Sequence, residues 1–175
     1  MIRKWLIASA ILAMSSQSVF ADCMGVSYGG FGAGVRDNIK NANNYRGIEG
    51  NLFLGYGMMM NPAFYIAGEA FLTPGSIPIN DNGLKTTYGF GASALPAIMI
   101  SEHTMAFLRL GIVETSFTNG SKKAGGQIGV GLQTGLTQNW DLRAEYIYSA
   151  YTTVTSKIGA PKSDQANMSL VYKFE

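Results

Sequence analysis

The sequence has little of the chemistry that most enzymes need. It contains one cysteine and one histidine in 175 residues, and only 14% of its residues are charged. The lone cysteine, Cys23, excludes an intrachain disulfide and therefore a disulfide-stapled secreted scaffold. Because no Cys or His residues cluster, the sequence predicts neither a metal site nor a cofactor.

Long apolar runs and helical periodicity are also missing after the first twenty or so residues. No later stretch reaches the roughly 18 consecutive apolar residues of a transmembrane helix. Removing Arg3 and Lys4 with the leader leaves 11 of the 13 basic residues, against 11 acidic ones, so the net charge becomes zero. A neutral chain is not expected to bind nucleic acid.

The first 21 residues follow the pattern of a secretory signal peptide. Arg3 and Lys4 precede a short apolar run at 5–14, and the segment SSQSVFA ends at Ala21. These features predict cleavage after Ala21, with a buried amphipathic helix as the alternative. The remaining chain, 22–175, has the length of one domain.

The rest of the sequence alternates between strand patterns and turn patterns. Eight segments emerge, and most exceed the roughly 5–6 residues of a soluble strand. Their length suits tilted strands that cross a bilayer in about 9–11 residues. The segments are 25–36, 45–57, 63–73, 85–100, 105–117, 124–137, 140–151 and 165–174.

Connections between these segments alternate in length. Those after the second, fourth and sixth segments are short, whereas the others are longer and polar. This layout is typical of an outer-membrane barrel with periplasmic turns and extracellular loops. The sequence therefore predicts an all-β fold, an eight-stranded antiparallel up-and-down transmembrane β-barrel at 22–175, with both ends in the periplasm.

Each segment has an apolar face and a mixed face. A soluble sandwich or lipocalin-like barrel would show the same alternation. However, glycine weakens a solvent-facing strand, whereas a narrow lumen has room only for small residues between larger ones. The mixed face carries Gly89, Gly91, Gly111, Gly129, Gly131 and Gly135 together with Phe53, Tyr65, Phe71 and Phe107. The mixed face is therefore predicted to line the lumen.

Charged residues on the predicted lumen face are balanced in sign, which favours a salt-bridged plug because buried charges persist when paired. Expected pairs are Glu69 with Arg109, and Glu145 with Arg143 or Lys173. A narrow ion path through this network is the functional alternative. The full set is Glu49, Glu69, Arg109, Arg143, Glu145 and Lys173.

Basic residues gather in the predicted outer loops and rims, and Arg36 is expected at the rim as well. They could meet lipopolysaccharide phosphates, since lysine binds phosphate as a point charge. A solvated loop surface is the plainer interpretation. The loop residues are Lys40, Arg46, Lys122, Lys123, Lys157 and Lys162.

Two segments resemble strands of a known family. WDLRAEYIY at 140–148 resembles the seventh strand, and MAFLRLGI at 105–112 the fifth strand, of opacity-type outer-membrane barrels, which include the barrel of outer-membrane protein A. Met168, Leu170, Tyr172 and Phe174 resemble the C-terminal signal that the barrel-assembly machinery recognises, although Glu175 follows the usual terminal aromatic. The resemblance implies a Gram-negative outer-membrane location.

Function is less constrained by these patterns than fold. The resemblance implies a structural or adhesive role at the cell surface, with four loops that could contact host or surface ligands. A narrow porin-like channel is the alternative, and an envelope-lipid-modifying enzyme is a third possibility. No catalytic residue is expected, because His103 lies in a short turn with no Ser–His–acid constellation around it.

Overall fold

The structure is a computed structural model that describes residues 25–40, 43–78, 85–118, 120, 122–151 and 162–174. The expected signal peptide at 1–21, Cys23, Lys157 and Glu175 lie outside the described residues. The division of the chain at Ala21 therefore stays a prediction.

Eight antiparallel strands form one closed sheet. Each strand pairs with the next along the chain, and the first pairs with the last, so the sheet has no free edge. This confirms the predicted barrel. The described residues contain no helix with the length and hydropathy needed to cross a membrane. The strands are β1 Gly25–Lys40, β2 Asn43–Asn61, β3 Phe64–Pro74, β4 Thr86–Ser101, β5 Thr104–Phe117, β6 Lys122–Gly135, β7 Trp140–Tyr151 and β8 Lys162–Phe174.

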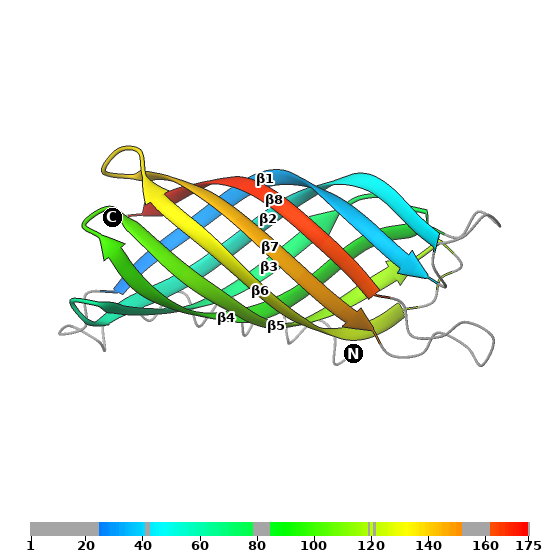
Figure 1. Ribbon diagram of the computed structural model, residues 1–175, viewed down its shortest axis with the longest axis horizontal. Coiled ribbons are helices and arrows are strands. Elements are labelled where there is room, and N and C mark those ends of the chain that lie inside the picture. Colours follow the sequence, from blue (N-terminus) through cyan, green and yellow to red (C-terminus); the bar gives the residue numbers. More distant parts are fainter. Residues whose placement is uncertain are drawn as a thin grey trace, which may run out of the picture.

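The strands run obliquely around the long axis of the barrel (Figure 1). The short turns after β2, β4 and β6 lie together at one end, which we call the inner end. The start of β1 and the end of β8 lie at the same end (Figure 1). The strand ends joined by the other four connections lie at the opposite, outer end. The connections after β3 and β7 are long, at 75–85 and 152–161, whereas the longer strands reduce those after β1 and β5 to 41–42 and 118–121.

Burial alternates along the strands with large apolar side chains outside. Met168 on β8 is 60% exposed, whereas Val171, on the opposite face of the same strand, is fully buried. The outward face also carries Ile48 and Ile112, while the charged and aromatic residues predicted for the lumen point inward. A water-soluble barrel would bury its apolar face, so this distribution requires an apolar solvent around the barrel.

The final strand is fully paired. From the inner end to the outer end, β8 pairs with β7 starting at Trp140 and Tyr172, and with β1 starting at Ser27 and Phe174. The C-terminal segment therefore closes the barrel, as its apolar alternation suggested.

The outer ends of four strands extend further than expected. The β1–β2 hairpin continues to Lys40 and Asn43, β6 begins at Lys122, and β8 begins at Lys162. The sequence suggested loops here because the side chains are polar. Backbone hydrogen bonding between strands does not require apolar side chains. Beyond the apolar band, at the outer end of the barrel, cross-strand pairs of opposite charge stabilise the pairing.

Candidate functional site

An ion-pair network fills the middle of the lumen. One carboxylate oxygen of Glu69 on β3 accepts a hydrogen bond from Arg109 at 2.6 Å, and the other accepts one from Arg143. Arg109 also contacts Glu145 at 3.0 Å and donates to Ser93 at 2.7 Å. All of these side chains are buried. The two arginines and two glutamates neutralise one another, as buried charges must.

Aromatic rings enclose the Arg143 guanidinium. Its central carbon lies 4.6 Å from the ring centre of Phe53, 5.1 Å from that of Phe107 and 5.6 Å from that of Tyr28. The central carbon of the Arg109 guanidinium lies 5.7 Å from the ring centre of Phe71. Cations on ring faces are favoured electrostatically, especially where water is excluded. Charges and rings together form a plug, which we call the mid-lumen plug.

The pairing inside the plug differs partly from the sequence expectation. Glu69 and Arg109 are in contact, but Glu145 pairs with Arg109 and not with Arg143 or Lys173. Arg143 pairs with Glu69 instead, so that Glu69 is shared by the two arginines. Alternation predicts which face of a strand a side chain lies on. Which lumen side chains meet depends on their positions along the barrel axis, and these are set by the stagger between strands, which alternation does not predict.

A second buried pair lies on the outer side of the plug. Arg36 contacts Glu49 at 2.9 Å, and both side chains are almost fully buried. The amide of Gln165, with its oxygen turned toward Arg36, accepts from the same guanidinium. The sequence placed Arg36 on the outer rim, and this is corrected: as part of β1 it faces the lumen. Arg36 is the last residue of the predicted segment 25–36, but β1 continues to Lys40, so Arg36 lies within the strand and not at its end.

Lys173 was expected near Glu145 but contacts Asp141, at 2.9 Å, at the inner mouth of the lumen. Asp141 in turn accepts from Gln133 at 2.6 Å, and Gln133 accepts from Arg143 at 2.8 Å. Polar side chains thus connect the plug to the inner mouth. The sequence predicts Asp141 only as one of the acids of the periplasmic side, and its burial beside the lumen does not follow from that position.

Ile77 is buried near the outer end of the lumen, against Gly47 of β2, and the sequence analysis did not predict this. It lies just after β3, is fully buried, and its backbone pairs with Thr86 at 2.9 Å. Phe117 and Tyr151 are buried at the same end of their strands. The polar stretch around Ile77 suggested only a solvated loop. An apolar residue isolated between two prolines of that loop was the available signal.

The family of the chain follows from its sequence and its geometry together. The sequence matches the model for the outer membrane protein beta-barrel domain over residues 6–174. The chain belongs to this family. Its location is therefore the bacterial outer membrane, and the opacity-type resemblance is confirmed. No curated protein matches the sequence.

Solved structures of surface barrels share the fold. Neisserial surface protein A superposes with a TM-score of 0.62 and 19% identity, covering 85% of this chain and 97% of that one. Ail, the attachment invasion locus protein of Yersinia pestis, was solved in complex with the heparin analogue sucrose octasulfate. It gives a TM-score of 0.59 and 19% identity, covering 86% of this chain and 99% of that one.

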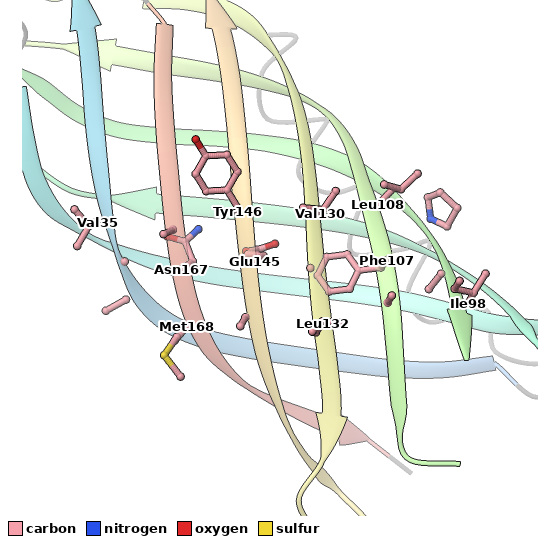
Figure 2. A pocket seen from close by; sticks show the side chains of 18 of the residues that line it. Val35, Ile98, Phe107, Leu108, Val130, Leu132, Glu145, Tyr146, Asn167 and Met168 are labelled. Carbon is pink, nitrogen blue, oxygen red and sulfur yellow. The ribbon is translucent and has the colours of Figure 1, made fainter. Parts of the chain in front are cut away.

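The membrane-facing wall of this outer-membrane barrel carries a broad groove of about 1040 Å³. Apolar outward side chains line it, among them Val35, Leu108, Leu132 and Met168 (Figure 2). Tyr146 stands beside Val130 in the same wall (Figure 2). In the outer membrane this surface meets lipid hydrocarbon.

The four residues of the expected assembly signal lie on the lipid side of β8. Met168, Tyr172 and Phe174 are exposed, and Leu170 is half-buried. Tyr172 packs edge-on against Trp140, with ring centres 5.0 Å apart, and against Phe174 at 5.3 Å. Aromatic rings of this kind suit the membrane interface, where one side is apolar and the other wet.

Most of the basic residues predicted for outer loops belong to strand ends instead. Lys40 ends β1, Arg46 lies within β2, Lys122 and Lys123 begin β6, and Lys162 begins β8. Of the two lysines of β6, Lys122 is exposed and Lys123 half-buried.

Two cations of the outer rim are held by neighbouring acids. Arg46 makes a bidentate contact with Asp37, at 2.8 and 2.9 Å. Lys122 contacts Glu114 at 3.0 Å and lies 5.7 Å from the ring centre of Phe90. These contacts fix cationic groups on a rigid wall, while leaving Arg46 75% and Lys122 40% exposed.

His103 lies where the sequence placed it, in the turn between β4 and β5 at the inner end, and it is exposed. Its carbonyl accepts from Gly135 at 2.8 Å, which ties this turn to the end of β6. Among the described residues, no group of three or more His, Cys, Asp and Glu side chains is placed to hold a metal ion.

Proposed function

We propose that this protein is a closed barrel that acts at the bacterial surface by binding polyanionic ligands through its outer rim. The observation that carries the proposal is the mid-lumen plug, in which two arginines are neutralised and covered by aromatic rings. A lumen occupied in this way favours a function on the outside of the barrel. At about eight strands, side chains are expected to fill the interior.

The charges of the outer rim support a polyanion as the ligand. The described chain at the outer rim carries Lys40, Arg46, Lys85, Lys122, Lys123 and Lys162 against Asp37, Glu114 and Asp164, so six minus three leaves three net positive charges. Sulfate and phosphate groups bind such cations through charge-assisted hydrogen bonds. Ail, which shares the fold, was solved with a sulfated heparin analogue. Sulfated glycans and lipopolysaccharide phosphates are therefore the ligand classes that we propose.

Binding of the refolded barrel to immobilised heparin tests this proposal. Replacing Arg46, Lys122 and Lys162 together by Gln should lower the salt concentration at which the protein elutes, because three exposed cations are lost. Asp164→Asn, on the same rim, is the matched control of opposite sign and should raise it. Elution of the triple variant at the salt concentration of the unmodified protein would contradict the proposal.

A narrow channel is the alternative function. The polar chain from the mid-lumen plug through Gln133 and Asp141 to the inner mouth is the feature that favours it. Planar-bilayer recording separates the two proposals. The closed barrel should show no discrete conductance steps, whereas regular steps from the unmodified protein would establish the channel. Lipid-modifying activity has weaker support, since the sole histidine lies at the inner end.

We further propose that the barrel-assembly machinery recognises the outward face of β8. Met168, Tyr172 and Phe174 are presented there, next to the seam that β8 forms with β1. Impaired membrane insertion in cells after replacing Phe174 by Ser, with refolding in detergent unchanged, is the expected result.

A further inference from the structure

The positive charge of the outer rim is concentrated on one side of the barrel, at the outer ends of the neighbouring strands β4, β5 and β6. Three bases and one acid lie there, so three minus one leaves two net positive charges. These four residues, which we call the basic sector, are Lys85, Lys122, Lys123 and Glu114. The rest of the described rim has three bases and two acids, which leaves one. Those five residues are Lys40, Arg46, Lys162, Asp37 and Asp164.

Two exposed lysines flank the outer end of β5. Lys85 lies directly before β4, and its backbone N–H donates to the hydroxyl of Thr118, the residue that follows β5, at 3.3 Å. The Lys85 carbonyl accepts from the Thr118 N–H at 3.0 Å. On the other side, Lys122 begins β6 and is paired in register with Ser116 of β5. Because both lysine side chains are exposed, one ligand with two phosphates can meet an ammonium group on each side of β5.

Lys122 also lies at the boundary between the polar rim and the apolar wall. Its ammonium contacts Glu114 at 3.0 Å and lies 5.7 Å from the ring centre of Phe90, an outward residue of β4. Glu114 and Phe90 are themselves register partners. A phosphate bound to Lys122 would therefore be joined, toward the inner end, to groups that meet an apolar surface.

The wall below the basic sector has a projecting residue with small neighbours on both sides. Ile112 on β5 is 70% exposed. Its register partners are Ala92 on β4 and Gly126 on β6, and both face outward. A Cβ atom at Gly126 would meet no atom of the described residues within 4 Å. Acyl chains therefore have room on either side of Ile112, where packing contacts rather than exclusion of water would hold them.

We infer that the basic sector and the wall below it bind the lipid A part of lipopolysaccharide from the outer leaflet. The inference rests on the proposed function, that the rim takes a polyanion, and adds that the anion at this sector is a membrane lipid. Phosphates contact Lys85 and Lys122, and acyl chains pack on both sides of Ile112. Lipid A fits better than a phospholipid because it carries two phosphates and several chains. A soluble sulfated glycan would use the cations alone.

Native mass spectrometry of the refolded barrel, released from detergent micelles, measures which lipids stay bound. The probes are bisphosphorylated lipid A and phosphatidylglycerol, which has one phosphate and two chains. We expect saturable binding of lipid A that is at least about tenfold tighter than that of phosphatidylglycerol, because a second charge-assisted contact is available. Equal affinity for the two lipids, or no saturable binding of lipid A, would overturn the inference.

Gly126→Leu tests the acyl contacts without changing any charge. The new side chain occupies the room beside Ile112 and should weaken the binding of lipid A about three- to tenfold, because one chain loses its packing against the wall. Gly68→Leu is the matched control: Gly68 also faces open space but lies on β3, outside this sector, so the affinity should not change. Equal affinities of the two variants would overturn the inference. So would a second copy of the chain bound in place of lipid A and lost in Gly126→Leu.

Replacing Lys85 and Lys122 together by Gln tests the cations. The double variant should bind lipid A at least about tenfold more weakly, because two charge-assisted contacts are lost. Glu114→Gln removes the acid of the sector and should tighten binding about two- to threefold, as expected for an exposed charge. An unchanged affinity in the double variant would overturn the inference.

Heparin elution of the same variants separates this inference from the proposed function. If the lysine variant elutes early from heparin while Gly126→Leu and Gly68→Leu bind lipid A equally, the rim binds polyanions and the lipid site is wrong. If lipid A binding follows the expected pattern while no rim variant changes its elution from heparin, the lipid site stands and the binding of soluble polyanions is wrong.

Discussion

Phe107 covers Gly131, its cross-strand partner on β6, so closely that a Cβ atom at Gly131 would lie 2.3 Å from Phe107 Cζ. The glycine has no side chain, and the aromatic ring occupies that space. Rings also lie over glycines of a neighbouring strand elsewhere around the lumen, with hypothetical Cβ contacts under 3 Å. The further pairs are Phe53 with Gly30, Tyr28 with Gly55, Tyr65 with Gly57, Phe71 with Gly91 and Tyr151 with Gly125. Lumen glycines therefore let rings lie against the wall, so that rings and ion pairs fill the interior together.

Gly131→Ala should destabilise the barrel by about 1–3 kcal/mol, because the added methyl group must displace the Phe107 ring from a filled interior. Urea unfolding followed by tryptophan fluorescence measures the loss. Gly68→Ala is the matched control, since a Cβ at Gly68, on the outward face, meets nothing within 4 Å. Equal effects of the two substitutions would show that ring packing at Gly131 is unimportant.

Glu69→Gln should destabilise the barrel more than any rim substitution, by about 3–5 kcal/mol, because Arg109 and Arg143 lose their shared buried anion. The measurement is again the free energy of unfolding. Asp37→Asn provides the comparison: it removes an acid from an exposed pair with Arg46, and a loss below about 1 kcal/mol is expected. If Glu69→Gln were as mild as Asp37→Asn, the plug would not be held by its charges.

Tyr172→Ala should lower the free energy of unfolding by about 0.5–1.5 kcal/mol beyond the effect of lost apolar area, since two edge-on ring contacts disappear. A double-mutant cycle with Trp140→Leu measures the coupling between the two rings. Additive effects in that cycle would contradict a specific contact. Tyr56, an outward tyrosine on β2, is the matched control position, and Tyr56→Ala should show no coupling to Trp140.

Alternation predicted the barrel because it is a local property. Period-two patterns assign the face of Glu69, Arg109 or Phe107 without knowledge of any neighbour. The partner of Glu145 and the burial of Ile77 depend on the stagger between strands and on a loop that folds inward, and neither leaves a local pattern. Composition misplaced Lys122 and Lys162 in loops because polarity marks water contact, whereas backbone pairing can continue into water.

Ile77→Ser tests whether the outer mouth and the mid-lumen plug close the barrel independently. The hydroxyl replaces a fully buried apolar side chain, so a loss of about 1–3 kcal/mol is expected. The barrel should nevertheless stay non-conducting in a planar bilayer, because Arg109, Arg143 and the rings around them lie deeper in the lumen and are untouched. If Ile77→Ser shows conductance steps and the unmodified protein shows none, then Ile77 is what blocks ion flow, and the ion-pair network lets ions pass. Glu69→Gln, recorded under the same conditions, completes the comparison, since it disturbs the plug and leaves Ile77 in place.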